Sequence, residues 1–465
     1  MKLTTTLTLI GVLCACSSQP KIDRTKAPDT PPLAPVKLPA PRESKLDNGL
    51  GIVMVPDSRL PLVTMRLVFR GGSRLDPQAQ PGLAETVASL MKAGTPSRSA
   101  QKIAEELAVI GGTLDANATP DAMWVSGSVL AEHTGALLEI TADIVRNSNF
   151  PQDEIDLRKQ NRIQELELQR SQAETLGDEK LHAVVFGSHP LSRTLPTPQS
   201  ILSIRQQDLL RFREQNITPS NAVLIVVGAL PANITDMIGS RLGDWPKKDV
   251  TPAASAELPK PTRSLTLIDR PGSAQVDILA GHLGVTRTDP DYFPLLVASN
   301  ILGGGASSRM FVNIREKQGF AYNAGAHHAP YRDTGFFTAT TQVREEVLEP
   351  AMKSVFAEMD RMAGEPVPAE ELSNVKNYLN GTFVMNFASQ DGVASQLASN
   401  RVNELPPDYL EKYVTRIRSV EPDQIQKAAA KYLSSADASV VIVGDASRIR
   451  KTVEKFGKVT VEKAK

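Results

Sequence analysis

The sequence predicts an α+β protein made of two homologous domains, each a mixed or antiparallel sheet with helices packed on one face. The chain has 465 residues, of which 41% are hydrophobic, and this is enough for two or three domains with sizeable cores. Residues 203–228 align without a gap with residues 419–444, at an offset of 216. Residues 73–77 align with residues 286–290, at an offset of 213. A repeat of about 215 residues is longer than a solenoid unit and therefore indicates a duplicated domain.

Each half begins with strand patterns, continues with long helical patterns and ends in a short apolar strand. Early in the first half, Asn48-Gly49 predicts a hairpin turn. Residues 63–69 then alternate between apolar side chains and the polar Thr64 and Arg66. This alternation predicts a strand with one buried face.

The segment GLAETVASLMKAGT, residues 82–95, predicts an amphipathic helix that begins at Gly82 and ends at Gly94. One face carries apolar residues at helical spacing: Leu83, Val87 and Leu90. The other face presents the spacing at which two histidines and a glutamate form a zinc peptidase site. Those positions hold Glu85, Ala88 and Ser89.

The N-terminus predicts export. Lys2 precedes an apolar run from Leu7 to Ala15 that is too short to span a bilayer as a helix. The following LCAC resembles a bacterial lipobox, which implies cleavage before Cys16 and a lipid on its thiol; an ordinary secretory signal is the alternative. By the same resemblance, Ser17 implies transport to the outer membrane of a Gram-negative cell. We therefore expect a lipid-anchored envelope protein that faces the periplasm.

The remaining composition says little about partners. Lys+Arg and Asp+Glu are 52 each, and this balance gives no indication of nucleic-acid binding. Both cysteines precede residue 17, so cysteine usage does not decide the redox compartment of the folded body. The predicted organisation is a signal peptide (1–15), a proline-rich tether (16–42), an N-terminal domain (43–246), a linker (247–264) and a C-terminal domain (265–465).

The chain resembles the M16 (pitrilysin-type) zinc peptidase family in its short bacterial form. The resemblance covers about residues 43 to 450 and is carried by four segments. They are LDNGLGIVMVPD (46–57), PLVTMRLVFRGGSRLDP (61–77), GLAETVASLMKAGT (82–95) and LGGGASSRMFVNIREKQGFAY (302–322). It implies two M16-type domains that form one half of a clamshell.

In active members, a His-x-x-Glu-His helix and a distant glutamate bind zinc and activate its water. The resemblance places the two histidines at Glu85 and Ser89, the catalytic glutamate at Ala88 and the distant ligand at Glu165. Zinc prefers nitrogen and sulfur donors, and alanine supplies no general base. We therefore expect no metal on this chain, and we interpret Glu85 and Glu165 as solvated positions on helices. The six histidines offer no paired replacement at helical spacing.

In the second half, IREKQGFAY keeps Arg315 and Tyr322 where the family has an Arg/Tyr pair. The resemblance implies that both side chains bind the substrate carbonyl and stabilise the developing oxyanion. The alternative is that Arg315 is a helix C-terminal charge and Tyr322 a sheet aromatic.

Two functions follow. The first is the zinc-free subunit of a heteromeric peptidase, which supplies Arg315 and Tyr322 to a zinc-bearing M16 homologue and encloses a peptide substrate. The second is a non-enzymatic lipoprotein scaffold that binds peptides or envelope proteins. An unusual enzyme that works alone is a third, less favoured interpretation.

Overall fold

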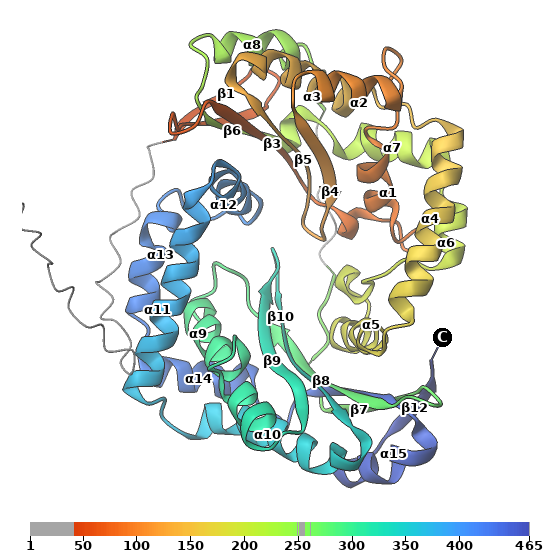
Figure 1. The fold of residues 1–465 in the computed structure, drawn as a ribbon, viewed down its shortest axis with the longest axis vertical. Coiled ribbons are helices and arrows are strands. Elements are labelled where there is room, and N and C mark those ends of the chain that lie inside the picture. Colours follow the sequence, from red (N-terminus) through yellow and green to blue (C-terminus); the bar gives the residue numbers. More distant parts are fainter. Residues whose placement is uncertain (1–40, 249, 251–255, 261, 465) are drawn as a thin grey trace, which may run out of the picture. The chain divides into compact units, whose positions relative to one another are not determined.

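The structure is a computed structural model that describes residues 41–248, 250, 256–260 and 262–464. The predicted signal peptide, Cys16 and nearly all of the tether lie outside these residues, as does part of the linker. Each half contains a six-stranded sheet with helices packed against it (Figure 1), which confirms the α+β class and the duplication. Within the described ranges, no helix has the length and hydrophobicity needed to cross a membrane. The domain boundaries stay predictions.

The first sheet has the strand order β1-β2-β6-β3-β5-β4. β6 is parallel to β2 and antiparallel to β3, so the last strand of this half lies at the centre of the sheet. The strands are β1 (Arg42–Lys45), β2 (Gly51–Pro56), β3 (Leu62–Arg70), β4 (Thr113–Ala118), β5 (Ala122–Leu130) and β6 (Ala222–Gly228). The helices are α1 (Leu83–Leu90), α2 (Ala100–Val109), α3 (Thr134–Asn147), α4 (Gln152–Arg170), α5 (Ala173–Phe186), α6 (Pro198–Ser203), α7 (Gln206–Asn216) and α8 (Ile234–Leu242).

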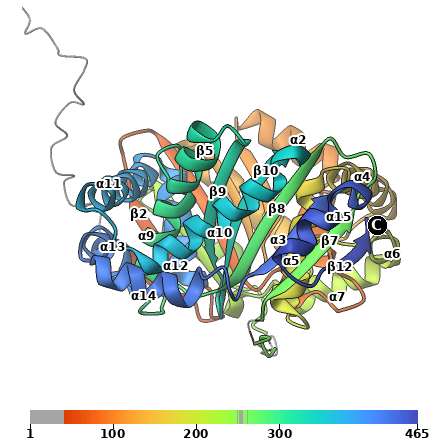
Figure 2. The same ribbon diagram turned by 90° about the horizontal axis from the view of Figure 1, so that it is seen from below.

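The second sheet repeats this plan with the order β12-β7-β11-β8-β10-β9, and α9, α10 and α14 lie against one of its faces (Figure 2). The strands are β7 (Ser264–Asp269), β8 (Gln275–Gly284), β9 (Ala321–Pro330), β10 (Gly335–Arg344), β11 (Ser439–Gly444) and β12 (Thr460–Lys463). The helices are α9 (Tyr292–Gly303), a π-helix (Phe311–Lys317), α10 (Leu348–Gly364), α11 (Ala369–Met385), α12 (Gln390–Val402), α13 (Tyr409–Arg418), α14 (Pro422–Tyr432) and α15 (Ala446–Val453).

The two halves exchange one equivalent helix. The repeat offset of 216 maps α5 onto α12, yet α5 packs on β8 and β11 of the second sheet whereas α12 packs on β3 and β6 of the first. The approach of α5 is close: a Cβ on Gly177 would lie 2.5 Å from a methyl group of Leu279. In return, the Gln390 amide of α12 donates to the Leu62 carbonyl of β3 at 3.2 Å. Each sheet therefore has one face covered by its own half and part of the other face covered by the opposite half.

This exchange corrects the prediction for residues 63–69. The alternating face is buried as expected, but Thr64 and Val68 on the opposite face are also only 5% and 4% exposed. Val68 belongs to the same hydrophobic cluster as Leu397 of α12. The alternation shows which face meets the helices of the first half, but it cannot show that a distant helix covers the second face.

The helix predicted for residues 82–95 is shorter than expected. It ends at Leu90, because the next turn tightens through bonds from the Met91 amide to the Ala88 carbonyl and from the Ala93 amide to the Leu90 carbonyl. The three apolar residues of the predicted face are buried as expected: Leu83, Val87 and Leu90.

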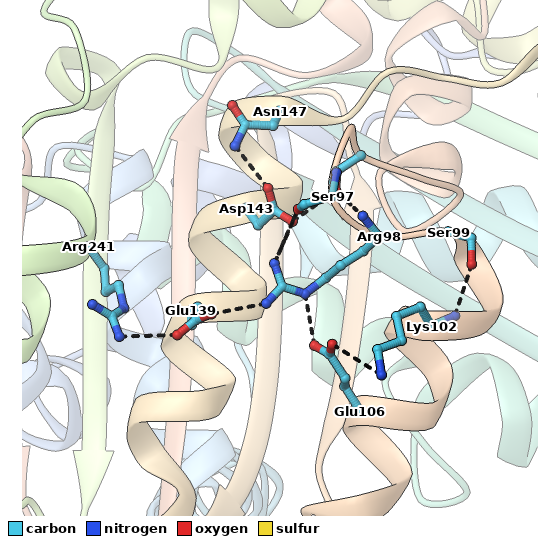
Figure 3. Close-up of polar contacts among 10 residues, drawn as sticks. Ser97, Arg98, Ser99, Lys102, Glu106, Glu139, Asp143, Asn147 and Arg241 are labelled. Carbon is cyan, nitrogen blue, oxygen red and sulfur yellow. Dashed lines mark hydrogen bonds and ion pairs between the residues drawn. The ribbon is translucent and has the colours of Figure 1, made fainter.

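Arg98 ties the loop after α1 to two helices of the first half (Figure 3). Its guanidinium donates to Glu106 of α2 at 2.8 Å and to Glu139 and Asp143 of α3 at 3.0 and 2.8 Å. The Arg98 side chain is 15% exposed, and hydrogen bonding to these carboxylates raises its pKa above the usual range of arginine. Arg241 extends the network by pairing with Glu139 at 3.1 Å.

His328 on β9 is buried in the second half without a charged partner among the described residues. Its Nε2 accepts a hydrogen bond from the Val285 amide at 3.2 Å, so protonation there would break this bond. A Cβ on Gly284 or Gly335 would lie 2.5 or 2.7 Å from the same nitrogen, and this explains the two glycines that face each other on β8 and β10. Burial lowers the pKa of His328 to about 4, with a further lowering by His327.

We predict that Arg98→Met lowers the free energy of unfolding by about 3 kcal/mol, because it leaves partly buried carboxylates without their positively charged partner. Arg241→Met is the matched control and should cost under about 1 kcal/mol, because its ion pair is half exposed. Urea denaturation followed by tryptophan fluorescence measures both, since Trp124 and Trp245 lie in the first half. Equal losses in the two variants would contradict a central role for Arg98.

We also predict an acid-sensitive second half. Because the pKa of His328 in the folded chain is below its unfolded value of about 6.5, protonation favours the unfolded state as the pH falls. The loss accumulates below about pH 6.5 and reaches about 3 kcal/mol at pH 4. Thermal melting at pH 7, 5.5 and 4 should show a smaller acid loss in His328→Gln than in the unsubstituted chain, with His133→Gln as the control. Parallel pH profiles in all three proteins would contradict this assignment.

Candidate functional site

The position of α1 is fixed from its N-terminus by Asp76. The Asp76 carboxylate accepts from the Gly82 and Ala84 amides at 2.7 and 2.8 Å, and this satisfies the first turn of the helix. Gly82 has φ 94°, a left-handed conformation that favours glycine. Burial raises the pKa of Asp76 to about 7, although both amide bonds oppose the shift. The capped first turn places Glu85 facing α4.

Glu85 lies in a cluster of four charged side chains that joins α1 to α4. Glu85 Oε1 lies 2.8 Å from Arg158 Nη2 and 3.1 Å from Arg162 Nε. Glu165 Oε1 lies 3.0 Å from Arg158 Nη1, and its Oε2 lies 3.8 Å from Arg162 Nη1. Two carboxylates thus share two guanidinium groups. The structure brings Glu85 and Glu165 together, as the resemblance implies, but through arginines.

Both glutamates are solvated, as predicted, but they also form ion pairs that the sequence analysis did not predict. The side chains of Glu85 and Glu165 are 41% and 50% exposed, yet both carboxylates contact the two arginines. The other two motif positions supply no strong metal ligand. Ala88 is buried in the core of the first half, and the Ser89 hydroxyl donates to the Thr86 carbonyl at 3.0 Å.

These residues do not fit a zinc ion. A zinc site needs at least three protein donors, usually histidine or cysteine, held around one point. Here the only strong donors at the motif positions are two carboxylates, and two positive charges already bind them. Across the described residues, no group of three or more His, Cys, Asp or Glu side chains is placed to hold a metal ion.

A cavity of about 240 Å³ adjoins this cluster. Glu85 and Gly82 line one side of it, and His182 and Tyr331 are among the residues that line the rest. Tyr331 is partly buried, and this burial raises its pKa to about 12.

Arg315 and Tyr322 lie together in the second half, on a π-helix and at the start of β9. The last turn of the π-helix closes through wide hydrogen bonds, such as the Gln318 amide to the Asn313 carbonyl at 3.1 Å. Short π-helical turns of this kind are frequent at functional sites. The Arg315 guanidinium carbon lies 4.5 Å from the centre of the Phe311 ring and 4.9 Å from that of Tyr322. Cation–π contacts to two rings hold this guanidinium.

The polar groups of this pair are available to a ligand. Among the described residues, no carboxylate or carbonyl accepts a bond from the Arg315 side chain, and no group bonds the Tyr322 hydroxyl. Tyr322 is 85% exposed, an unusual state for a large aromatic residue. The alternative, a helix C-terminal charge beside a sheet aromatic, accounts for the secondary structure but not for the stacking of the two side chains.

A small acidic hollow of about 160 Å³ lies beside Tyr322. Glu174 of the exchanged helix α5 and Asp277 of β8 are among the residues that line it. The Gln342 amide donates to both oxygens of Asp277 at 3.1 and 3.2 Å. Burial raises the pKa of Asp277, and the nearby Glu174 charge adds to the shift.

Sequence reasoning missed three residues of these two groups. Arg158 and Arg162 lie seven and three residues before Glu165, a helical spacing that places all three on one face of α4. Phe311 lies four residues before Arg315, again one turn away. These helical spacings are the features of the sequence from which the three residues could have been predicted. Within the described residues, no hydrogen bond, ion pair or ring contact links the four-charge cluster to the Arg315–Tyr322 pair.

The duplicated α+β fold with its two six-stranded sheets is the architecture that the resemblance to M16 peptidases implies. Family models agree. Residues 52–199 match the model described as insulinase (peptidase family M16), and residues 203–379 match the peptidase M16 inactive domain. Together these models span more than half of the chain, which therefore belongs to the M16 family.

Known proteins support this membership. An "uncharacterized zinc protease" of Rickettsia felis is 28% identical over 412 residues, which cover 86% of this chain and 96% of that protein. The crystal structure of a peptidase M16 inactive domain from Pseudomonas fluorescens is similar with a TM-score of 0.82 and 25% identity, and covers 87% of this chain and 98% of that one. A protease from Helicobacter pylori shares the fold, with a TM-score of 0.81, 19% identity and coverage of 87% and 100%.

Proposed function

We propose that this chain is the zinc-free subunit of a heteromeric M16 metallopeptidase. It supplies Arg315 and Tyr322 to a zinc-bearing M16 homologue, and the two chains together hydrolyse peptides. The guanidinium and the phenol bind the substrate carbonyl and stabilise the oxyanion that forms on it. Zinc belongs to the partner, which also supplies the general base that Ala88 cannot provide here.

The observation that carries this proposal is the state of Arg315. Its guanidinium is held by Phe311 and Tyr322 rather than by a carboxylate. Its positive charge is therefore not neutralised by an acid, and its N–H groups can donate charge-assisted hydrogen bonds to a ligand. Arg98 is instead tied to acids, whereas Arg416 also stacks on two rings, those of Phe293 and Tyr409. A cation fixed in position but not neutralised suits transition-state binding, because it needs no rearrangement when charge develops.

The alternative is a non-enzymatic scaffold that binds peptides or envelope proteins. The replaced metal ligands favour it as much as they favour a zinc-free subunit. A scaffold, however, has no chemical use for the Tyr322 hydroxyl, and this difference separates the two functions experimentally.

We further propose that the mature chain is anchored through a lipid on Cys16 and faces the periplasm from the outer membrane. In this arrangement the segment 17–42 separates the peptidase from the membrane. A lipid anchor would keep the enzyme at the envelope without a membrane-spanning helix.

The Tyr322 hydroxyl gives the sharpest test. We expect Tyr322→Phe to lower kcat of the co-purified pair about 100-fold, as loss of one oxyanion donor does in other enzymes. Turnover of quenched-fluorescent peptides measures it, and size-exclusion chromatography checks that the pair stays assembled. Tyr378→Phe on α11 is the matched control, because that tyrosine is also exposed. Full turnover by an intact Tyr322→Phe pair would refute the catalytic role and support the scaffold.

Phe311 should act as a positioning residue for Arg315. We expect Phe311→Leu to lower kcat/KM of the pair about fivefold, because about 1 kcal/mol of cation–π energy is lost. Phe311→Tyr keeps an aromatic face and should restore most of the activity. If the leucine and tyrosine variants were equally impaired, the ring contact would not be the cause.

A further inference from the structure

We propose that Arg158 and Arg162 take, in this chain, the electrostatic place of the metal ion, and that they keep divalent cations out of the site. The proposal concerns the first half alone, so it holds or fails independently of the proposed partner. It rests on the four-charge cluster between α1 and α4 and on the positions that the family gives to its metal ligands.

The charges of the cluster are arranged as they would be around a metal ion. The two positive groups lie inside, with the Arg162 and Arg158 side chains 7% and 19% exposed. The two carboxylates lie outside, 41% and 50% exposed, and converge on the guanidinium groups. Two guanidinium groups carry the same total charge as Zn²⁺. The cluster is therefore neutral, with its positive charge held between the two helices.

Arg158 is the bridging group. Its Nη2 binds Glu85 of α1 at 2.8 Å, and its Nη1 binds Glu165 of α4 at 3.0 Å. One side chain thus connects the position of the first family histidine to the position of the distant ligand. A metal ion would make the same connection between the two helices.

The arrangement also explains how Arg158 and Arg162 can be one turn apart. Like charges at this spacing repel, and the repulsion is stronger for partly buried groups. Glu85 and Glu165 cancel it. Because the carboxylates are already bound and two positive charges lie beside them, a divalent cation entering this space would be repelled and would lack free donors.

The consequence is that restoring the ligands is not enough to restore the metal. Glu85→His and Ser89→His, with the native Glu165, would supply the two-histidine, one-glutamate set that suits zinc. Ala88 stays unchanged in this design, because the family position that it occupies is catalytic rather than ligating and its side chain is buried. The two arginines would still hold Glu165 and repel the ion.

The test measures zinc affinity by competition with a chromophoric chelator and zinc content by elemental analysis. We expect no bound zinc in the native chain and little in Glu85→His/Ser89→His. Adding Arg158→Gln and Arg162→Gln should give one zinc per chain, bound at least about 100-fold more tightly than in the two-histidine variant. Equal zinc affinity with and without the arginines, or no zinc in the fourfold variant, would overturn the proposal.

Thermal melting provides a second measurement that needs no metal. The pairs Glu85→Gln/Glu165→Gln and Arg158→Gln/Arg162→Gln each leave like charges together, whereas the combined neutral variant leaves none. We expect both half-neutralised variants to melt below the fully neutral one, because the two sets of charges are coupled. Additive losses, with the neutral variant melting lowest, would show that the arginines do not hold the carboxylates as a metal does.

Discussion

The exchange of α5 and α12 is the constraint on which the rest of the structure depends. Both sheets are apolar on their two faces, and each half has helices for only one of them. Val68 of the first sheet and Leu279 of the second would meet water if the halves separated. Because α5 follows α4 after two residues, the exchange also leads the chain from the four-charge cluster to the hollow beside Tyr322, where Glu174 of α5 lies. The packing of α5 on the second sheet therefore connects the four-charge cluster to the surroundings of Tyr322 through the consecutive helices α4 and α5.

The charged groups of the candidate site have different partners in the two halves. In the first half, the positions that bind metal in active relatives are neutralised internally: Glu85 and Glu165 meet arginines, and Arg98 meets three acids. In the second half, Arg315 is left with aromatic partners. Ion pairs of the first kind add rigidity and contribute little chemistry, whereas a stacked guanidinium keeps its capacity to bind an oxyanion.

The fold class and the duplication could be predicted from the sequence, because repeat offsets and motif spacing are local or periodic signals. The resemblance pointed to Arg315 and Tyr322 as a pair, but their cation–π contact is visible only in the structure. The sequence did not predict the second buried face of β3, since alternation describes one strand and not the distant helix α12 that covers Thr64 and Val68. It also did not predict the ion pairs of Glu85 and Glu165, which were expected only as solvated positions on separate helices. Arg158 and Arg162 were visible at helical spacing from Glu165, but their contact with Glu85 depends on how α1 and α4 pack, which no pattern within α4 reveals.

The position of Arg315 beside two rings costs free energy of folding. A half-buried guanidinium without a carboxylate loses hydration, and two cation–π contacts return only about 1–2 kcal/mol of that loss. Folding alone would favour an acidic partner of the kind that Arg98 has. A π-helical turn and an 85% exposed Tyr322 add to the cost, because regular helix and buried aromatic surface are more stable. These three features occur together at one point, and each is explained if an oxygen of a bound peptide completes the site. None of them is needed to join α1 to α4 or to cover a sheet, so the packing of this chain does not by itself account for them.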